Sequence, residues 1–190
     1  MSFPFAYAAP SGGVDLLTIP KAFLAYVVAY LEQSGVTVPD RRYVGGGTPQ
    51  DVAWDCEQIT ITLAEVGWGR SKDATQLSPS FGKQASVDAM RHATYALTLV
   101  RCYPTIDDRG ELPTLDELEA AGEQQMIDAG LLSQAGVNFV AFPNDAVPPG
   151  ASVQAGAVQP VGPAGGFLGL ELALTATVST LNPPAPGQRT

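Results

Sequence analysis

The chain has 190 residues, of which 45% are hydrophobic and 15% charged, enough apolar material for one packed core. With 19 acidic and 10 basic residues its formal charge is −9, so it lacks the basic surface that holds nucleic-acid phosphates. Two cysteines and one histidine cannot supply the four ligands of a structural zinc site, and they exclude a disulfide-dense secreted scaffold.

The chain also lacks the marks of membrane insertion or export. No apolar run reaches the roughly 18 residues of a membrane-spanning helix. The first 13 residues lack the basic start and apolar core of a signal peptide. We therefore expect a soluble, unexported protein whose two cysteines are reduced.

The N-terminal part predicts an arm followed by a helix. Residues 1–14 contain two prolines and the aromatic residues Phe3, Phe5 and Tyr7, a composition typical of an extended assembly arm. Residues 18–34 carry apolar side chains at helical spacing, with Pro20 in the first turn and a glycine after the end. This pattern predicts a helix.

Three later segments alternate apolar and polar or small side chains, as half-buried strands do. They are residues 56–66, 93–102 and 167–179, and we expect the first two to pair antiparallel. A short edge strand is expected around Tyr43, because charged residues and glycines flank it. The leucines of the last strand are expected to pack against the first helix.

The sequence Thr114-Leu115-Asp116-Glu117 is a capping box, which predicts the start of a second helix. Apolar or small residues continue at helical spacing and define its expected buried stripe. That stripe contains Leu115, Leu118, Ala121, Gln125, Met126, Ala129 and Leu132.

Residues 143–166 hold five prolines and five glycines. This composition favours an irregular insertion, either a flexible loop or a segment ordered by a neighbouring molecule.

These elements predict an α+β fold, with a mainly antiparallel sheet of about four strands and two main helices packed on it. Residues 15–181 are expected to form a single domain, in which 143–166 is the insertion. Residues 182–190, rich in proline, are expected to be a flexible tail.

Catalytic chemistry has little support in this sequence. A nucleophile and base would have to combine His92 with Cys56, Cys102 or a serine, but a solvated or locally hydrogen-bonded histidine and two buried, packed thiols are the simpler interpretation. The glycines of residues 45–47 lack the lysine of a phosphate-binding loop. We predict no catalytic, cofactor or metal site.

Charge is concentrated in residues 104–128, where eight acids oppose Arg109 alone. Either they form a solvated helix face, or they form an acidic surface that faces a basic partner or the lumen of a ring. The acids assigned to this candidate surface are Asp107, Asp108, Glu111, Glu117, Glu119 and Glu123.

The order of elements resembles a known family. A long N-terminal helix is followed by Tyr43-Val44-Gly45-Gly46-Gly47, a strand from Cys56 and a strand from His92 that ends in Arg101 and Cys102. A second helix and a final strand containing Phe167-Leu168-Gly169-Leu170 complete the order. This arrangement is similar to the tail terminator proteins of long-tailed bacteriophages, particularly those that infect actinobacteria.

The resemblance implies a structural virion protein of the tail and neck region, assembled in the host cytoplasm. Such a subunit forms a homo-oligomeric, hexameric ring that caps the tail tube, terminates tail growth and joins the head-closure or connector protein. DNA passes through its lumen without specific binding, and neither a cofactor nor a membrane is involved.

Other functions stay open at this stage. The insertion at 143–166 and the aromatic arm depart from the compact family pattern, which leaves room for a head-closure (stopper) protein or a tail tube subunit. A small hydrolase or ligand-binding domain that uses His92 is the alternative from another class.

Overall fold

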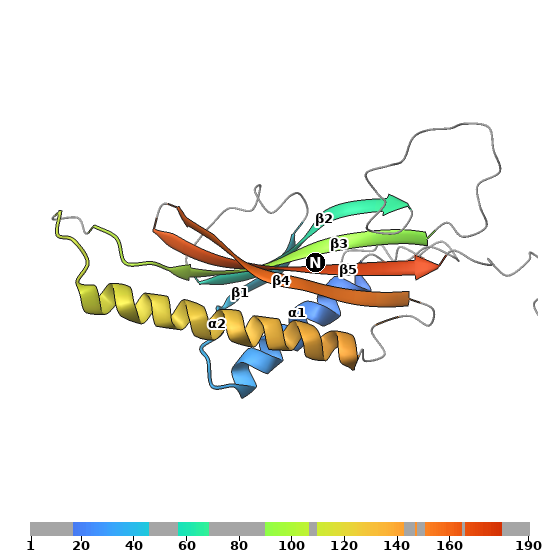
Figure 1. The fold of residues 1–190 in the computed structure, drawn as a ribbon, viewed down its shortest axis with the longest axis horizontal. Coiled ribbons are helices and arrows are strands. Elements are labelled where there is room, and N and C mark those ends of the chain that lie inside the picture. Colours follow the sequence, from blue (N-terminus) through green and yellow to red (C-terminus); the bar gives the residue numbers. More distant parts are fainter. Residues whose placement is uncertain are drawn as a thin grey trace, which may run out of the picture.

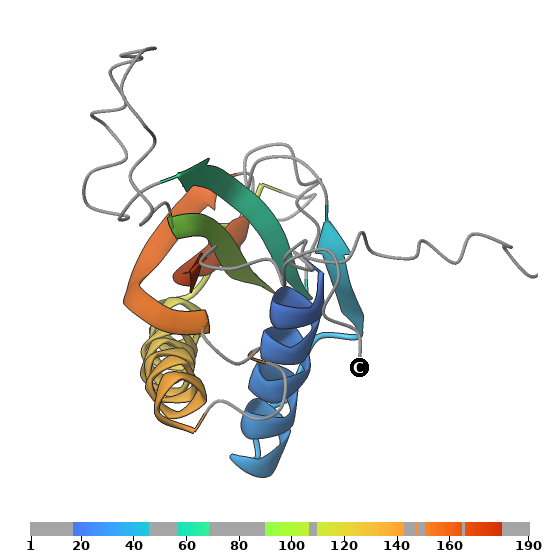
Figure 2. The same ribbon diagram turned by 90° about the vertical axis from the view of Figure 1, so that its right-hand side faces the viewer.

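The computed structural model describes residues 17–45, 57–68, 90–106, 110–142, 147, 151–164 and 166–179. They form two helices and one five-stranded sheet, and both helices lie on the same face of that sheet (Figures 1 and 2). The elements are α1 (Thr18–Gln33), β1 (Arg41–Gly45), β2 (Gln58–Trp68), β3 (Met90–Cys102), α2 (Leu115–Ala141), β4 (Ala151–Ala164) and β5 (Phe167–Ser179). The α+β class predicted from the sequence is confirmed.

The first helix ends as the sequence predicts. Gly35 has a φ of +76°, and the Val36 N–H donates to the Leu31 carbonyl at 3.2 Å. The Gly35 N–H donates to the Glu32 carbonyl at 3.1 Å, which completes a Schellman motif. Glycine suits this position because it adopts a left-handed conformation without steric cost.

The sheet has the strand order β1-β2-β3-β5-β4. All pairs are antiparallel except β1 with β2, which are parallel. The predicted edge strand at Tyr43, the antiparallel pairing of the next two strands and the final strand are therefore confirmed.

The prediction of an irregular insertion at 143–166 was wrong for most of that segment, because residues 151–164 form β4. β4 is an edge strand, so a proline such as Pro160 need not donate a hydrogen bond on the open side. Two register shifts interrupt its pairing with β5, and Val153 is buried in the core. The local composition predicted a loop because proline and glycine weaken most strands. It could not show that this segment lies at a sheet edge, where both residues are tolerated.

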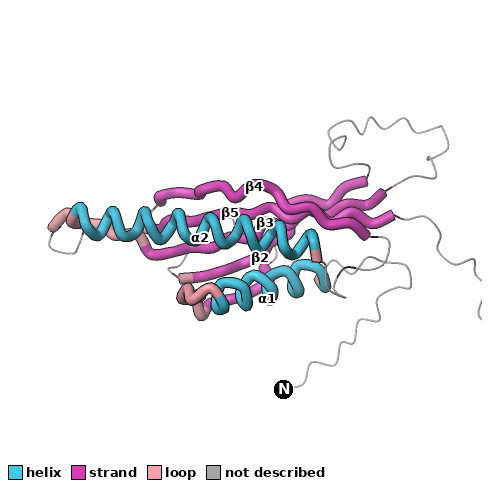
Figure 3. The backbone as a smooth tube through the Cα atoms, turned by 60° about the horizontal axis from the view of Figure 1, so that its bottom comes forward, coloured by secondary structure: helices cyan, strands magenta, loops and turns pink. Residues whose placement is uncertain are grey.

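Each helix covers its own part of the sheet. α1 packs over β1 and β2, and α2 packs over β4 and β5 (Figure 3). The two helices meet at Phe139, whose ring centroid lies 4.9 Å from that of Phe23 and 5.5 Å from that of Tyr26. Three of the β5 leucines, Leu170, Leu172 and Leu174, are buried as predicted, and Leu168 is only half-buried. The helix that contacts β5 is α2 rather than the predicted α1.

The predicted buried stripe of α2 was partly wrong. Leu115 is 82% exposed and Met126 is 69% exposed, whereas Leu132 is fully buried. The buried residues are Asp128, Leu132, Ala135, Gly136 and Phe139. Small residues and a carboxylate form much of this face, so hydrophobicity alone did not identify it.

The first half of β2 is buried on both faces rather than half-buried, whereas Ala64, Glu65 and Val66 in its second half are exposed. Ile59 and Ile61 belong to the hydrophobic core, and Thr60 and Thr62 on the other face are also inaccessible to solvent. Across the part of the chain that the structure describes, neither helix is long and apolar enough to cross a membrane.

Candidate functional site

A cleft opens between the N-terminal half of α2 and the neighbouring ends of β3 and β5. Its volume is about 460 Å³, within the range of small-ligand sites. Leu99, Leu168 and Leu170 of the sheet form an apolar wall, and Gln124 and Gln125 of α2 lie opposite. We take this cleft as the candidate site because apolar walls with a few polar groups are typical of binding sites.

A cluster of three charged side chains lies in this cleft. Arg101 on β3 donates from Nε to Asp128 Oδ2 at 2.9 Å and from Nη2 to Asp128 Oδ1 at 3.3 Å. Its Nη1 donates to Glu57 Oε2 at 2.7 Å. One guanidinium therefore joins the start of β2, the end of β3 and the middle of α2.

Burial makes this cluster energetically important. Asp128 is 0% exposed, and it accepts a further hydrogen bond from Gln124 Nε2 at 3.0 Å. Burial opposes the charged form of Arg101, but hydrogen bonds and charge from Asp128 and Glu57 outweigh that penalty and raise its pKa. The guanidinium is charged at every physiological pH.

The sequence interpretation missed Asp128 as a buried group and counted it among the acids of a charged segment. Its position carried a usable signal, because Asp128, Leu132, Ala135 and Phe139 recur at helical spacing. A carboxylate on the apolar face of a helix needs a cationic partner, since an unpaired buried charge is costly.

Glu57 is held in an unusual backbone conformation. Its φ is +56°, a left-handed value that costs a residue with a Cβ about 1 to 2 kcal/mol. Its carboxylate accepts hydrogen bonds from Arg101 and, at 3.3 Å, from the Cys102 N–H. These contacts hold the residue at the point where β2 begins.

The prediction that Cys102 is a packed, reduced thiol was wrong. Cys102 is exposed and disulfide-bonded. The chain has only one other cysteine, Cys56, which lies outside the described residues. A disulfide is a covalent constraint beside the charged cluster, and spacing alone did not indicate it because no CxxC motif is present.

Of the two predicted states of His92, a solvated or a locally hydrogen-bonded ring, the structure excludes the solvated one. His92 is 1% exposed, and its Nε2 lies 3.7 Å from Glu65 Oε1, beyond hydrogen-bond range. His92 and Cys102 are ten residues apart on one strand, so about 33 Å separates them. The structure does not bring them together as a nucleophile and base.

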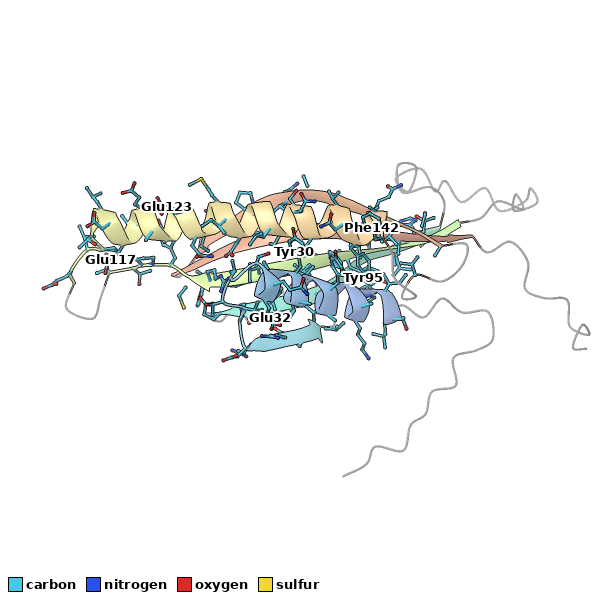
Figure 4. All side chains as sticks on the ribbon, turned by 90° about the horizontal axis from the view of Figure 1, so that it is seen from below. Tyr30, Glu32, Tyr95, Glu117, Glu123 and Phe142 are labelled. Carbon is cyan, nitrogen blue, oxygen red and sulfur yellow. The ribbon has the colours of Figure 1, made fainter. Side chains whose placement is uncertain are left out.

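The acids of the predicted surface do not form one cluster. Glu111, Glu117, Glu119 and Glu123 are all exposed, and Figure 4 shows Glu117 near the start of α2 and Glu123 farther along it. Glu119 and Glu123 are one turn apart and share a helix face, whereas Glu117 lines the cleft. Asp107 and Asp108 lie outside the described residues, as do Phe3, Phe5 and Tyr7.

Glu117 completes the predicted capping box. Its Oε2 accepts from the Thr114 N–H at 2.8 Å and from the Thr114 hydroxyl at 2.9 Å, and these bonds lower its pKa. The Glu117 N–H donates to Thr114 Oγ1 at 3.3 Å. Glu117 therefore has a structural role at the start of α2, although it borders the cleft.

Within the described ranges, no group of three or more histidine, cysteine, aspartate or glutamate side chains is arranged to hold a metal ion. No protein-family model matches the chain, and a comparison with curated proteins finds no significant match. Functional inference therefore depends on the residues and geometry of the chain itself.

Proposed function

We propose that this chain is a structural virion protein of the tail terminator type, which assembles into a closed ring on the end of a bacteriophage tail tube. The ring ends tube growth and then joins the tail to the head connector. The proposed assembly is a hexamer located in the tail and neck region of the virion.

The sheet geometry is the observation that carries this proposal. Helices cover one face, and the sheet has two edge strands, β1 and β4, at opposite sides (Figure 2). An edge strand presents backbone donors and acceptors that can pair with another chain. Two different edges on one subunit support head-to-tail contacts, which close into a ring when the rotation between subunits allows it.

The charge distribution supports passage of DNA without adhesion. The described side chains include four cations, Lys21, Arg41, Arg42 and Arg101, and the last two are ion-paired with acids. Stable phosphate binding depends on clustered lysine and arginine side chains. A lumen lined by this subunit would not retain a passing duplex.

Neck proteins such as a head-closure (stopper) protein, and tail tube subunits, use the same kind of ring and are the alternatives within this proposal. A ligand-binding domain is favoured by a different observation, the largely apolar cleft beside Arg101. Binding of a small molecule in that cleft by a stable monomer would support it.

Native mass spectrometry and negative-stain electron microscopy of the purified chain test the proposal. We expect closed rings of one stoichiometry that bind to one end of tubes assembled from the tail tube protein of the same virus. Rings that bind only to the head connector would indicate a stopper protein, and rings that stack into tubes would indicate a tube subunit. A monomer at all concentrations that leaves tube ends uncapped would contradict the ring proposal.

A further inference from the structure

The outer edge of β1 lies beside an apolar groove. The groove has a volume of about 420 Å³ and runs between α1 and the helix-facing side of β1. Its middle is lined by Leu24, Ala25, Val28 and Val44. Among the residues that the structure describes, β1 pairs with β2 alone, so a strand added at its outer edge would place alternate side chains in this groove.

The ends of the groove are charged. Lys21 lies at one end, and Arg42 and Glu32 at the other, where Arg42 Nη1 donates to Glu32 Oε1 at 3.0 Å. Both cations border an apolar surface, a setting in which ammonium and guanidinium groups attract aromatic rings. The groove therefore fits an extended segment with aromatic side chains.

The N-terminal arm has that chemistry. Phe3, Phe5 and Tyr7 occupy alternate positions, so in an extended strand they lie on one face. Pro4 and Pro10 occupy the intervening set of positions. In a strand, the N–H groups of odd-numbered and even-numbered residues point to opposite sides. If the odd-numbered residues pair with the neighbouring strand, Pro4 and Pro10 face away from it, where no N–H donor is required.

We propose that residues 3–9 of a second copy add as a strand to the outer edge of β1 and place Phe3, Phe5 and Tyr7 in the groove. Main-chain hydrogen bonds supply pairing, and the aromatic side chains supply specificity. Residues 10–16, which connect this strand to Leu17, span up to about 24 Å when fully extended. The inference rests on the proposed self-assembly and specifies the contact that drives it.

Two full-length variants separate the donor from the acceptor. In the arm variant, Phe3→Ser, Phe5→Ser and Tyr7→Ser remove the aromatic side chains. In the groove variant, Ala25→Arg fills the groove from an exposed position of α1, where arginine is a good helix former. Gln33→Arg is the matched control, because it lies on the same helix, exposed and outside the groove.

We expect each variant alone to weaken self-association by at least about tenfold, since aromatic anchors dominate such contacts. The control should assemble as the unmodified chain does. A mixture of the two variants should form a heterodimer and stop there, because one copy has an intact arm and the other an intact groove. Native mass spectrometry distinguishes this heterodimer by mass.

Amide hydrogen exchange across Tyr43 and Val44 provides the second measurement. Successive N–H groups of a strand point to opposite sides, so one of these two amides faces β2 and the other faces the outer edge. Exchange of the outward-facing amide should be slow in the assembled protein and fast in both variants. In the mixture it should be slow again in the arm variant only, whose intact groove is filled. The opposite result would be slow exchange in an unmodified chain that is monomeric, fast exchange in the arm variant, and no heterodimer in the mixture. It would mean that the arm binds its own subunit, and it would overturn the proposal. Normal rings from both variants would also overturn it while leaving the proposed ring function intact.

Discussion

Arg101 on β3 binds Asp128 on α2 through two parallel hydrogen bonds, in a region where Asp128 has no solvent exposure. This pair ties the middle of α2 to the end of the sheet that carries the cleft. Because two buried charges compensate each other, removing one leaves the other without its main partner. The pair therefore positions the cleft wall.

Replacing Asp128 with Ala should lower the free energy of unfolding by about 3 to 5 kcal/mol, because Arg101 would keep only Glu57 as a partner. Urea unfolding followed by circular dichroism measures the change. Glu119→Ala, on the exposed side of the same helix, is the control and should change stability by less than about 0.5 kcal/mol. Equal effects at the two positions would show that the buried pair is not formed.

Leu172→Ala should cost about 2 to 5 kcal/mol, because the fully buried side chain packs beneath α2 and its removal leaves a cavity. Leu115→Ala removes the same atoms from a side chain that is largely exposed and should be nearly neutral. Thermal unfolding of both variants tests which face of α2 and β5 is buried. A large loss at Leu115 would contradict the assignment.

Gly67→Ala should destabilise the fold, because a Cβ at this position would lie 2.5 Å from Cε1 of the buried His92 ring. Overpacking of this kind typically costs about 1 to 3 kcal/mol. In a His92→Ser background the cost of Gly67→Ala should shrink, since the obstructing ring is gone. A double-mutant cycle from chemical unfolding measures the coupling, and strictly additive effects would contradict the contact.

The first turn of α2 should loosen in acid. The pKa of Glu117 is lower in the folded chain than its ordinary value of 4.5, so its contribution to stability is complete above pH 4.5 and is lost as the pH falls through the folded value. Glu117→Gln should remove this pH dependence. The measurement is amide exchange at residues 115–118, compared between neutral pH and a pH below 4.5 in both proteins. If protection of these amides falls in acid equally in the variant, another group causes the loosening.

The exposed acids of α2 separate two models of the ring. If Glu119 and Glu123 face the lumen, the double variant Glu119→Lys, Glu123→Lys should assemble into particles that release DNA slowly. High salt should bring the rate of DNA release closer to normal, because it screens the attraction between lysine and phosphate. If these acids face a basic partner, the same variant should fail to join tails to heads. Particle assembly by electron microscopy and DNA release at two salt concentrations distinguish the outcomes, and normal behaviour in both assays would reject a role for this face.

Some features of this protein follow from short stretches of sequence. The alternation of Leu170, Leu172 and Leu174 predicts β5, because a strand repeats every two residues whatever surrounds it. Thr114 with Glu117 predicts the start of α2, because a capping box is completed within one turn.

Other features depend on contacts between residues distant in sequence. β4 exists despite Pro160 because it lies at an edge, a position that only the assembled sheet defines. Asp128 is buried because Arg101, on another element, faces it. The cleft and the groove beside β1 likewise arise from the relative placement of helices and strands. Local sequence therefore determined most of the segments that form regular elements. Tertiary packing decided that β4 is a strand, which faces of the elements are buried and where surfaces for binding are left.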